Sequence, residues 1–278
     1  MIQTPVYNEF LDTEYKTGAR QHVARLEKKV SGNRISYEVD FEAFERGVKK
    51  SGMFLLCHPH NPIGKIYSSA ELQRMAEICI ENNVTIVSDE IHSELLLGSA
   101  AFTPLAKISR EVEKRSITLI SASKAFNVPG LACAFAILPD AELRKKFQEV
   151  ANGMSFEFST PGLTAARIAY SGKADAWLKD LRRYLTANRD FILEYVEENL
   201  PGVRLTKPDA TYLMWLDFSA YKLQPSPYDY FLQEAKVAFS DGGKFGKGNE
   251  QFVRLNFGTS RRLVEQGLNR MRKALSKI

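Results

Sequence analysis

The chain has 278 residues, of which 44% are hydrophobic and 26% charged, and these values are ordinary for a globular protein with a sizeable buried core. Its 38 basic and 33 acidic residues are mixed along the chain, and the net charge of +5 comes without the clustered Lys and Arg typical of nucleic-acid binding. We find neither a signal-peptide pattern nor an apolar run of the ~18 residues that a membrane span needs. The sequence therefore predicts a soluble, cytoplasmic protein without nucleic-acid or membrane partners.

The cysteines give no sign of a disulfide framework. Cys57, Cys79 and Cys133 lie far apart, each inside an apolar run, and no CxxC spacing is present. An odd number of cysteines at such spacing argues against paired disulfides and against a zinc site. We therefore predict three buried thiols and no metal centre.

The first half of the chain alternates apolar runs with helical periods. Strands are predicted at Met53–Cys57, Val84–Ser88, Ile117–Ser121 and Leu131–Leu138. Helices are predicted over Asp40–Val48, from a capping box at Ser68–Glu71, and over Ala141–Val150, with an extended piece at His22–Leu26. Strands that alternate with helices predict an α/β fold with a mainly parallel sheet covered by helices.

The second half has a different pattern. Helices are predicted at about Ala174–Asn199, Tyr228–Lys236 and Arg261–Leu275, and short strands at Thr211–Leu216, Val237–Phe239 and Phe252–Asn256. These elements are typical of a smaller α+β domain. We therefore expect a large domain over residues 1–155, and a long connecting helix with a small C-terminal domain over residues 156–278.

Three polar segments follow predicted strands, at the edge where open α/β sheets bind ligands. Asn61 lies in a tight turn with two prolines, Asp89 ends the second strand, and Lys124 follows the third. Alone, Asn61 could simply satisfy the turn, and Asp89 could cap a helix. Lys124 is less ordinary, because a lysine directly after an apolar strand suits Schiff-base chemistry.

Two further segments lie near the C-terminus. The alternation of Phe252–Gly258 places Arg254 on one face of a strand, where a guanidinium can grip a carboxylate through two parallel hydrogen bonds. The glycine-rich stretch Asp241–Gly248 suggests a nucleotide-binding loop, but Asn249 stands where that motif needs Ser or Thr. A mobile loop near the substrate entrance is the better interpretation.

Together these motifs occur in a recognisable order: N-P-I-G from Asn61, D-E-I-H from Asp89, S-A-S-K ending at Lys124, and R-L-N from Arg254. This order resembles the fold-type-I enzymes of the class I/II aminotransferase family, which use pyridoxal 5'-phosphate (PLP). Within that family, D-E-I-H and the stretch S-K-A-F-N-V-P-G-L resemble the PatB/MalY-type cystathionine β-lyases (C–S lyases). The resemblance covers nearly the whole chain, and it implies PLP as cofactor and a homodimer.

The resemblance also implies roles for the residues that contact the cofactor ring. Lys124 would form a Schiff base with PLP and then move the substrate α-proton. Asp89 would pair with the pyridine nitrogen and keep it protonated. Asn61 would donate a hydrogen bond to the phenolate oxygen, and His92 stands where many relatives have a tyrosine that contacts the same oxygen.

The phosphate and the substrate would be held by other residues. Ser121 and Ser123 match phosphate-contacting serines, and Arg254 would bind the substrate α-carboxylate. The wider family usually has a phosphate-binding arginine eight residues after the lysine, where this chain has Ala132. Because the C–S lyase branch commonly lacks that arginine, Ala132 favours this branch.

Three functions stay open at this point. The first is a C–S β-lyase that converts cystathionine or a related cysteine conjugate to a thiol, pyruvate and ammonia. The second is an aminotransferase on the same scaffold. The third is a catalytically impaired, partner-binding family member, because the resemblance implies an earlier region with a phosphate-cradling loop and a ring-stacking aromatic residue, and we find neither in this sequence.

Overall fold

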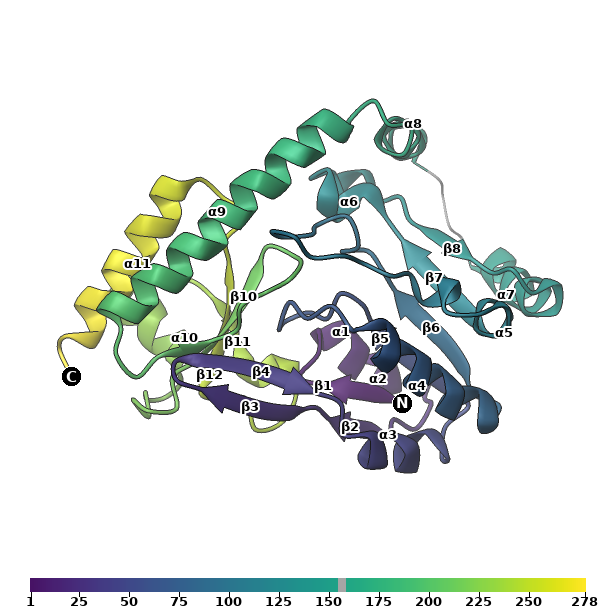
Figure 1. Cartoon of the computed structure of the whole chain (residues 1–278), viewed down its shortest axis with the longest axis horizontal. Coiled ribbons are helices and arrows are strands. Elements are labelled where there is room, and N and C mark those ends of the chain that lie inside the picture. Colours follow the sequence, from purple (N-terminus) through teal and green to yellow (C-terminus); the bar gives the residue numbers. More distant parts are fainter. Residues whose placement is uncertain (155–158) are drawn as a thin grey trace.

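The computed structural model describes residues 1–154 and 159–278, and it contains a four-stranded sheet, a six-stranded sheet and a two-stranded pair (Figure 1). The predicted domain boundary between residues 155 and 156 lies outside the described residues. None of the helices in the described part is long and apolar enough to cross a membrane.

The four-stranded sheet has the order β5-β6-β7-β8. Its strands are β5 (Met53–Cys57), β6 (Thr85–Asp89), β7 (Ser116–Ile120) and β8 (Phe135–Ile137). The first three run parallel and β8 pairs antiparallel with β7, so the predicted α/β fold with a mainly parallel sheet is confirmed. The fourth strand is shorter than predicted, because Pro129–Leu131 form a 3₁₀ turn that ends at Ala132 with φ 47°.

Two helices cover one face of this sheet. Helix α3 (Phe41–Val48) buries Phe44, whose ring lies edge-on to Phe54 of β5 at 4.9 Å between centroids. Helix α4 (Ser69–Glu81) begins with the predicted capping box, in which the Ser68 and Glu71 side chains each bond the other's backbone N–H. Burying a phenylalanine side chain stabilises a fold by roughly 1.5–3 kcal/mol, so these apolar faces fix both helices on the sheet.

The six-stranded sheet has the order β11-β12-β10-β9-β4-β3. Its strands are β3 (Glu27–Ser31), β4 (Arg34–Glu38), β9 (Arg204–Leu205), β10 (Leu213–Asp217), β11 (Ser240–Asp241) and β12 (Phe252–Asn256). The β3–β4 hairpin was not predicted, and it joins strands from near the C-terminus. This sheet therefore contains strands from both sides of residue 155. The division of the chain into two domains at that residue stays a prediction.

The longest helix, α9 (Asp175–Asn199), lies beside α11 (Arg261–Leu275) along one side of the molecule (Figure 1). Both helices agree with their predicted ranges to within one residue, and they share one apolar cluster with β10 and β12. The predicted strand Val237–Phe239 is wrong: these side chains pack against that cluster, and the backbone pairs only from Ser240 onward.

The remaining elements are short or lie at the periphery. Strands β1 (Ile2–Thr4) and β2 (Val23–Arg25) pair in parallel, which agrees with the predicted extended piece near residue 22. The other α-helices are α1 (Asn8–Leu11), α2 (Thr13–Thr17), α5 (Arg110–Lys114), α6 (Ala122–Ala125), α8 (Thr160–Ala169) and α10 (Pro227–Tyr230). The predicted helix near residues 228–236 is divided into α10 and a π-helical turn, Phe231–Ala235.

The glycine-rich stretch after β11 is packed against its surroundings. Gly242, Phe245 and Asn249 are buried, and Val6 N donates to Phe245 O at 3.1 Å. Two of the three cysteines, Cys57 and Cys79, are buried as predicted, whereas Cys133 is half-buried because the segment around it is short and peripheral.

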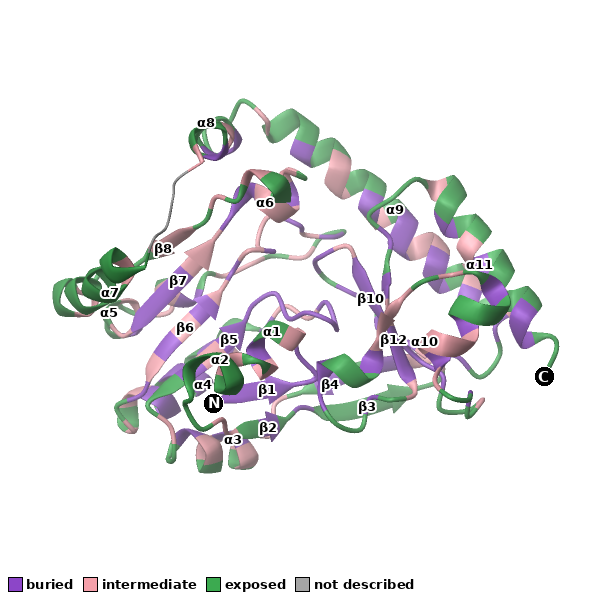
Figure 2. Ribbon diagram, turned by 180° about the vertical axis from the view of Figure 1, so that it is seen from behind, coloured by how far each residue is buried: buried purple, intermediate pink, exposed green. Residues whose placement is uncertain are grey.

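Helix α7 (Ala141–Gly153) differs from the other long helices. None of its 13 residues is buried, and Figure 2 shows it almost entirely in the colour of exposed residues. Phe147 is 43% exposed and Val150 is 68% exposed. The helix follows β8, which is an end strand of the four-stranded sheet.

Gly64 fixes the turn that carries Asn61, and its replacement should be costly. Its φ is +70°, and an added Cβ would lie 2.2 Å from the Cβ of Pro208. We expect Gly64→Ala to lower the free energy of unfolding by about 3 kcal/mol, because left-handed strain adds to a steric clash. Gly18 has a φ of +69° with open space around it, so Gly18→Ala should cost only about 1 kcal/mol. Urea unfolding of both variants tests this difference, and equal losses would contradict it.

Candidate active site

A cavity of about 250 Å³ brings together residues from both large sheets. Five of the seven predicted site residues line it: Asn61, Asp89, His92, Lys124 and Arg254. The other lining residues are Tyr7, Phe10, Cys57, Ile91, Tyr212, Leu213 and Asn256. Ser121 and Ser123 do not line it. The cavity lies where the predicted parallel strands end, as expected for a ligand site in an open α/β sheet.

Asp89 is the last residue of β6 and pairs with Cys57 of β5 and Leu119 of β7. Its carboxylate accepts a hydrogen bond from Ile91 N at 3.2 Å. Burial raises the pKa of Asp89 to about 6, and the positive charge of Lys124 opposes this rise. A second cation against this carboxylate would stabilise its charged form, so Asp89 can pair with a protonated ring nitrogen.

Lys124 lies in α6, directly after β7. The helix is capped by Ser121, whose Oγ accepts a hydrogen bond from Ser123 N at 3.1 Å and lies 2.7 Å from the carbonyl oxygen of Cys133. The Ser121 hydroxyl is thus used in fixing the turn that presents the lysine. The two serines hold the segment in this structure, and their phosphate contacts stay a prediction.

Asn61 and Arg254 join the two sheets. Arg254 Nη1 donates to Asn61 Oδ1 at 2.9 Å, and its Nη2 donates to Ser240 Oγ at 3.0 Å. The guanidinium also lies over the Phe245 ring, 4.9 Å from its centroid. Because Asn61 uses its oxygen for Arg254, its amide N–H groups remain for a ligand in the cavity.

His92 is buried, and its ring lies edge-on to Tyr212 at 5.8 Å between centroids. Burial, together with the charges of Lys124 and Arg254, lowers the pKa of His92 to about 3. The imidazole is therefore neutral at physiological pH. Its Nδ1 has no hydrogen-bond partner among the described residues, so it can accept or donate one hydrogen bond to a ligand.

Several lining residues were not found from the sequence. Asn256 could have been, because it stands two residues after Arg254 in a strand and therefore shares its face. Tyr7 and Phe10 were also missed: no aromatic residue was predicted at the site, yet both side chains line the cavity. Tyr7 is held there by its backbone N–H, which donates to Asn61 O at 3.1 Å.

Comparison with known protein families shows which family this chain belongs to. Residues 2–271 match the family described as "Aminotransferase class I and II". The chain belongs to this family. Cystathionine β-lyase PatB of Bacillus subtilis is 38% identical to it, over 99% of this chain and 71% of PatB, and places it in the PatB/MalY branch of the family.

Solved structures of the family have the same fold. Cystalysin from Treponema denticola, which contains a pyridoxal 5'-phosphate cofactor, superimposes with a TM-score of 0.94 at 28% identity, over 99% of this chain and 70% of cystalysin. A PLP-bound C–S lyase from Staphylococcus hominis gives a TM-score of 0.90 at 29% identity, over 99% and 71% of the two chains. The fold is thus that of fold-type-I PLP enzymes.

The cavity residues of this family member fit PLP. The cavity contains an amine on Lys124, a half-buried carboxylate on Asp89 and, on Asn61, an amide N–H without a partner among the described residues; these suit an aldehyde, a ring nitrogen and a ring oxygen respectively. The aromatic ring of Tyr7 offers a flat surface for the pyridine ring. The unpaired Nδ1 of His92 is a buried polar atom that a ligand would satisfy.

Proposed function

We propose that this chain is a PLP-dependent C–S β-lyase that acts on cystathionine or a related cysteine conjugate. The reaction takes up one water and yields a thiol, pyruvate and ammonia. The observation that supports this most is the convergence of Asn61, Asp89, His92, Lys124 and Arg254 on one cavity. Relatives named cystathionine β-lyase and C–S lyase support the type of reaction.

The proposed roles follow from the chemistry of each side chain. PLP, when bound, draws electrons from the substrate's Cα–H bond. Lys124 is the covalent anchor, and its amine takes the proton from Cα. The Asp89 carboxylate would pair with the ring nitrogen, and Arg254 would bind the substrate carboxylate and so orient the Cα–H bond for cleavage.

An aminotransferase is the second candidate, because the family includes that activity. The test is to mix the chain with PLP and L-cystathionine, without any 2-oxo acid, and to assay free thiol and pyruvate. Equal release of both supports the lyase. A parallel assay contains a 2-oxo acid, and amino-group transfer in that assay alone, without thiol release in either, would identify an aminotransferase. Binding of PLP without either reaction would identify an impaired family member.

Arg254→Lys should raise the KM for amino-acid substrates by about 100-fold with a smaller change in kcat. A lysine is a point charge and cannot replace two guanidinium hydrogen bonds, each contributing about 1.5–3 kcal/mol. Steady-state kinetics with cystathionine measures this. Arg261 is a matched control, because its Nε bonds Asn188 and its guanidinium lies over Phe191, outside the cavity. A similar rise in KM in Arg261→Lys would contradict a role specific to Arg254.

A further inference from the structure

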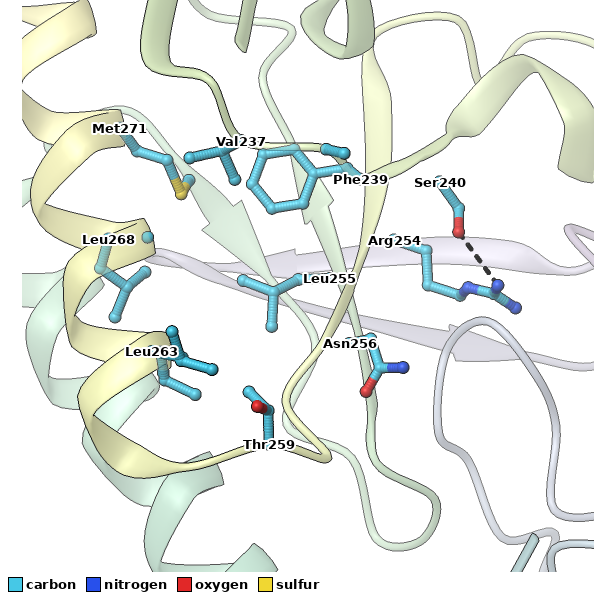
Figure 3. Close-up of a pocket in the computed structure, with 13 residues that line it drawn as sticks. Val237, Phe239, Ser240, Arg254, Leu255, Asn256, Thr259, Leu263, Leu268 and Met271 are labelled. Carbon is cyan, nitrogen blue, oxygen red and sulfur yellow. Dashed lines mark hydrogen bonds between the residues drawn. The ribbon is translucent and has the colours of Figure 1, made fainter. Parts of the chain in front are cut away.

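The Arg254 guanidinium is held from two sides before any ligand is considered. Asn61 accepts from Nη1. Ser240 accepts from Nη2, and Figure 3 shows this second contact as a dashed line. The face of the Phe245 ring lies 4.9 Å from Cζ. These three contacts define the plane and the direction of the guanidinium.

Ser240 is itself fixed by its surroundings. It lies directly opposite Arg254 in the β11–β12 pairing. The next residue, Asp241, accepts a hydrogen bond from Gly243 N at 3.0 Å. Gly242 is pressed against the next strand, where an added Cβ would lie 2.2 Å from Phe252 O. The short strand is therefore anchored, and the position of the Ser240 hydroxyl follows from it.

The hydroxyl has no competing partner. Among the described residues its one hydrogen bond is that with Arg254. On the other side of this pair lies a pocket lined mostly by apolar side chains, such as Val237, Leu255 and Met271 (Figure 3). Its other polar lining residues, Asn256 and Thr259, form no hydrogen bond with the Ser240 hydroxyl among the described residues.

Arg254 keeps binding capacity for an anion. Within residues 1–154 and 159–278, the buried Nε of Arg254 has no hydrogen-bond partner. Within the same residues, no acidic side chain forms an ion pair with the Arg254 guanidinium. A buried donor without a partner is costly, and a carboxylate entering the cavity would satisfy it.

We propose that Ser240 is a positioning residue that orients Arg254 for the α-carboxylate of the substrate. This rests on the proposed function, which assigns the carboxylate to Arg254. An arginine that is already oriented loses less side-chain freedom on binding, and so binds more tightly. Ser240 therefore sets the affinity for ligands that carry a carboxylate and leaves the chemical step unchanged.

The test compares two ligands that differ only in the carboxylate. The dissociation constants of L-alanine and ethylamine are measured by calorimetry with the PLP-loaded wild-type chain, Ser240→Ala and Ser240→Thr. We expect the constant for L-alanine to rise about five- to tenfold in Ser240→Ala and to return to within twofold in Ser240→Thr, which keeps the hydroxyl. The constant for ethylamine should not change. Ser109→Ala, which removes a helix-capping hydroxyl far from the cavity, is the control for a general loss of stability.

The outcomes separate the two proposals, because L-alanine has no leaving group. If the wild-type chain releases thiol from cystathionine, and wild type and Ser240→Ala bind L-alanine equally well, the proposed role of Ser240 is wrong and the proposed lyase function stands. An equal rise for both ligands also overturns it, since a merely structural change would act on both. Binding of L-alanine that depends on Ser240, without thiol release, supports the positioning role and contradicts only the lyase.

Discussion

The Lys124→Ala variant is expected to lose thiol release from cystathionine by about 10⁴-fold, the upper range for removing a general acid or base. The lysine lies in the cavity with Asp89 and His92, and among the described residues no other lysine lines it. No nearby amine can therefore replace it. The measurement is the initial rate of thiol release with saturating PLP.

A second measurement on this variant does not depend on turnover. Borohydride reduction of the PLP-treated wild-type chain should add the mass of reduced PLP to the peptide that contains Lys124, and the variant should show no such addition. Lys146→Ala, on the exposed helix α7, should behave as wild type. A variant that keeps a tenth of the activity, or a label on another lysine, would refute the assignment of Lys124.

The Asp89→Asn variant should lose activity and gain stability. Without a carboxylate the ring nitrogen of PLP has no anionic partner, and removing one such electrostatic contact lowers kcat by about 10²–10³-fold. Stability of the PLP-free protein should change in the other direction, because burial raises the pKa of Asp89 from 3.8 to about 6.

The sign follows from linkage. A carboxyl whose pKa is raised on folding binds its proton more tightly in the folded state, so its contribution to stability is full below pH 3.8 and is lost as the pH rises through about 6. At pH 8 the PLP-free Asp89→Asn protein should therefore be about 2–3 kcal/mol more stable than wild type, and near pH 4 the difference should vanish. Thermal unfolding at both pH values measures this. A variant that is less stable than wild type at pH 8 would show that another contact of Asp89 outweighs its burial.

The site residues that follow strands were predictable, because an apolar run marks where each strand ends. Asp89 and Lys124 stand at or directly after such runs, and parallel strands bring their ends to one edge. Arg254 was predictable from strand alternation. Their assignment to PLP came from the order of the motifs, which local physics does not supply.

Other features depend on contacts between distant segments, and the sequence shows no local sign of them. The hairpin of residues 27–38 was missed because every residue of β3 is exposed, so the strand has no apolar alternation. Ser240 was missed because its strand has two residues and gains its position from pairing with β12. Tyr7 reaches the cavity through the loop of Asn61, which is far away in sequence.

The solvent exposure of helix α7 has a practical consequence for handling the protein. Its apolar side chains have little packing to lose, so charged residues at Phe147 and Val150 should change the free energy of unfolding by no more than about 0.5 kcal/mol. The same changes would remove exposed apolar side chains from the helix that follows β8, an end strand of its sheet, and such surfaces and edges promote association between chains. Phe147→Lys with Val150→Glu should thus raise the solubility limit, measured by light scattering against concentration, while the cavity and its chemistry stay as they are.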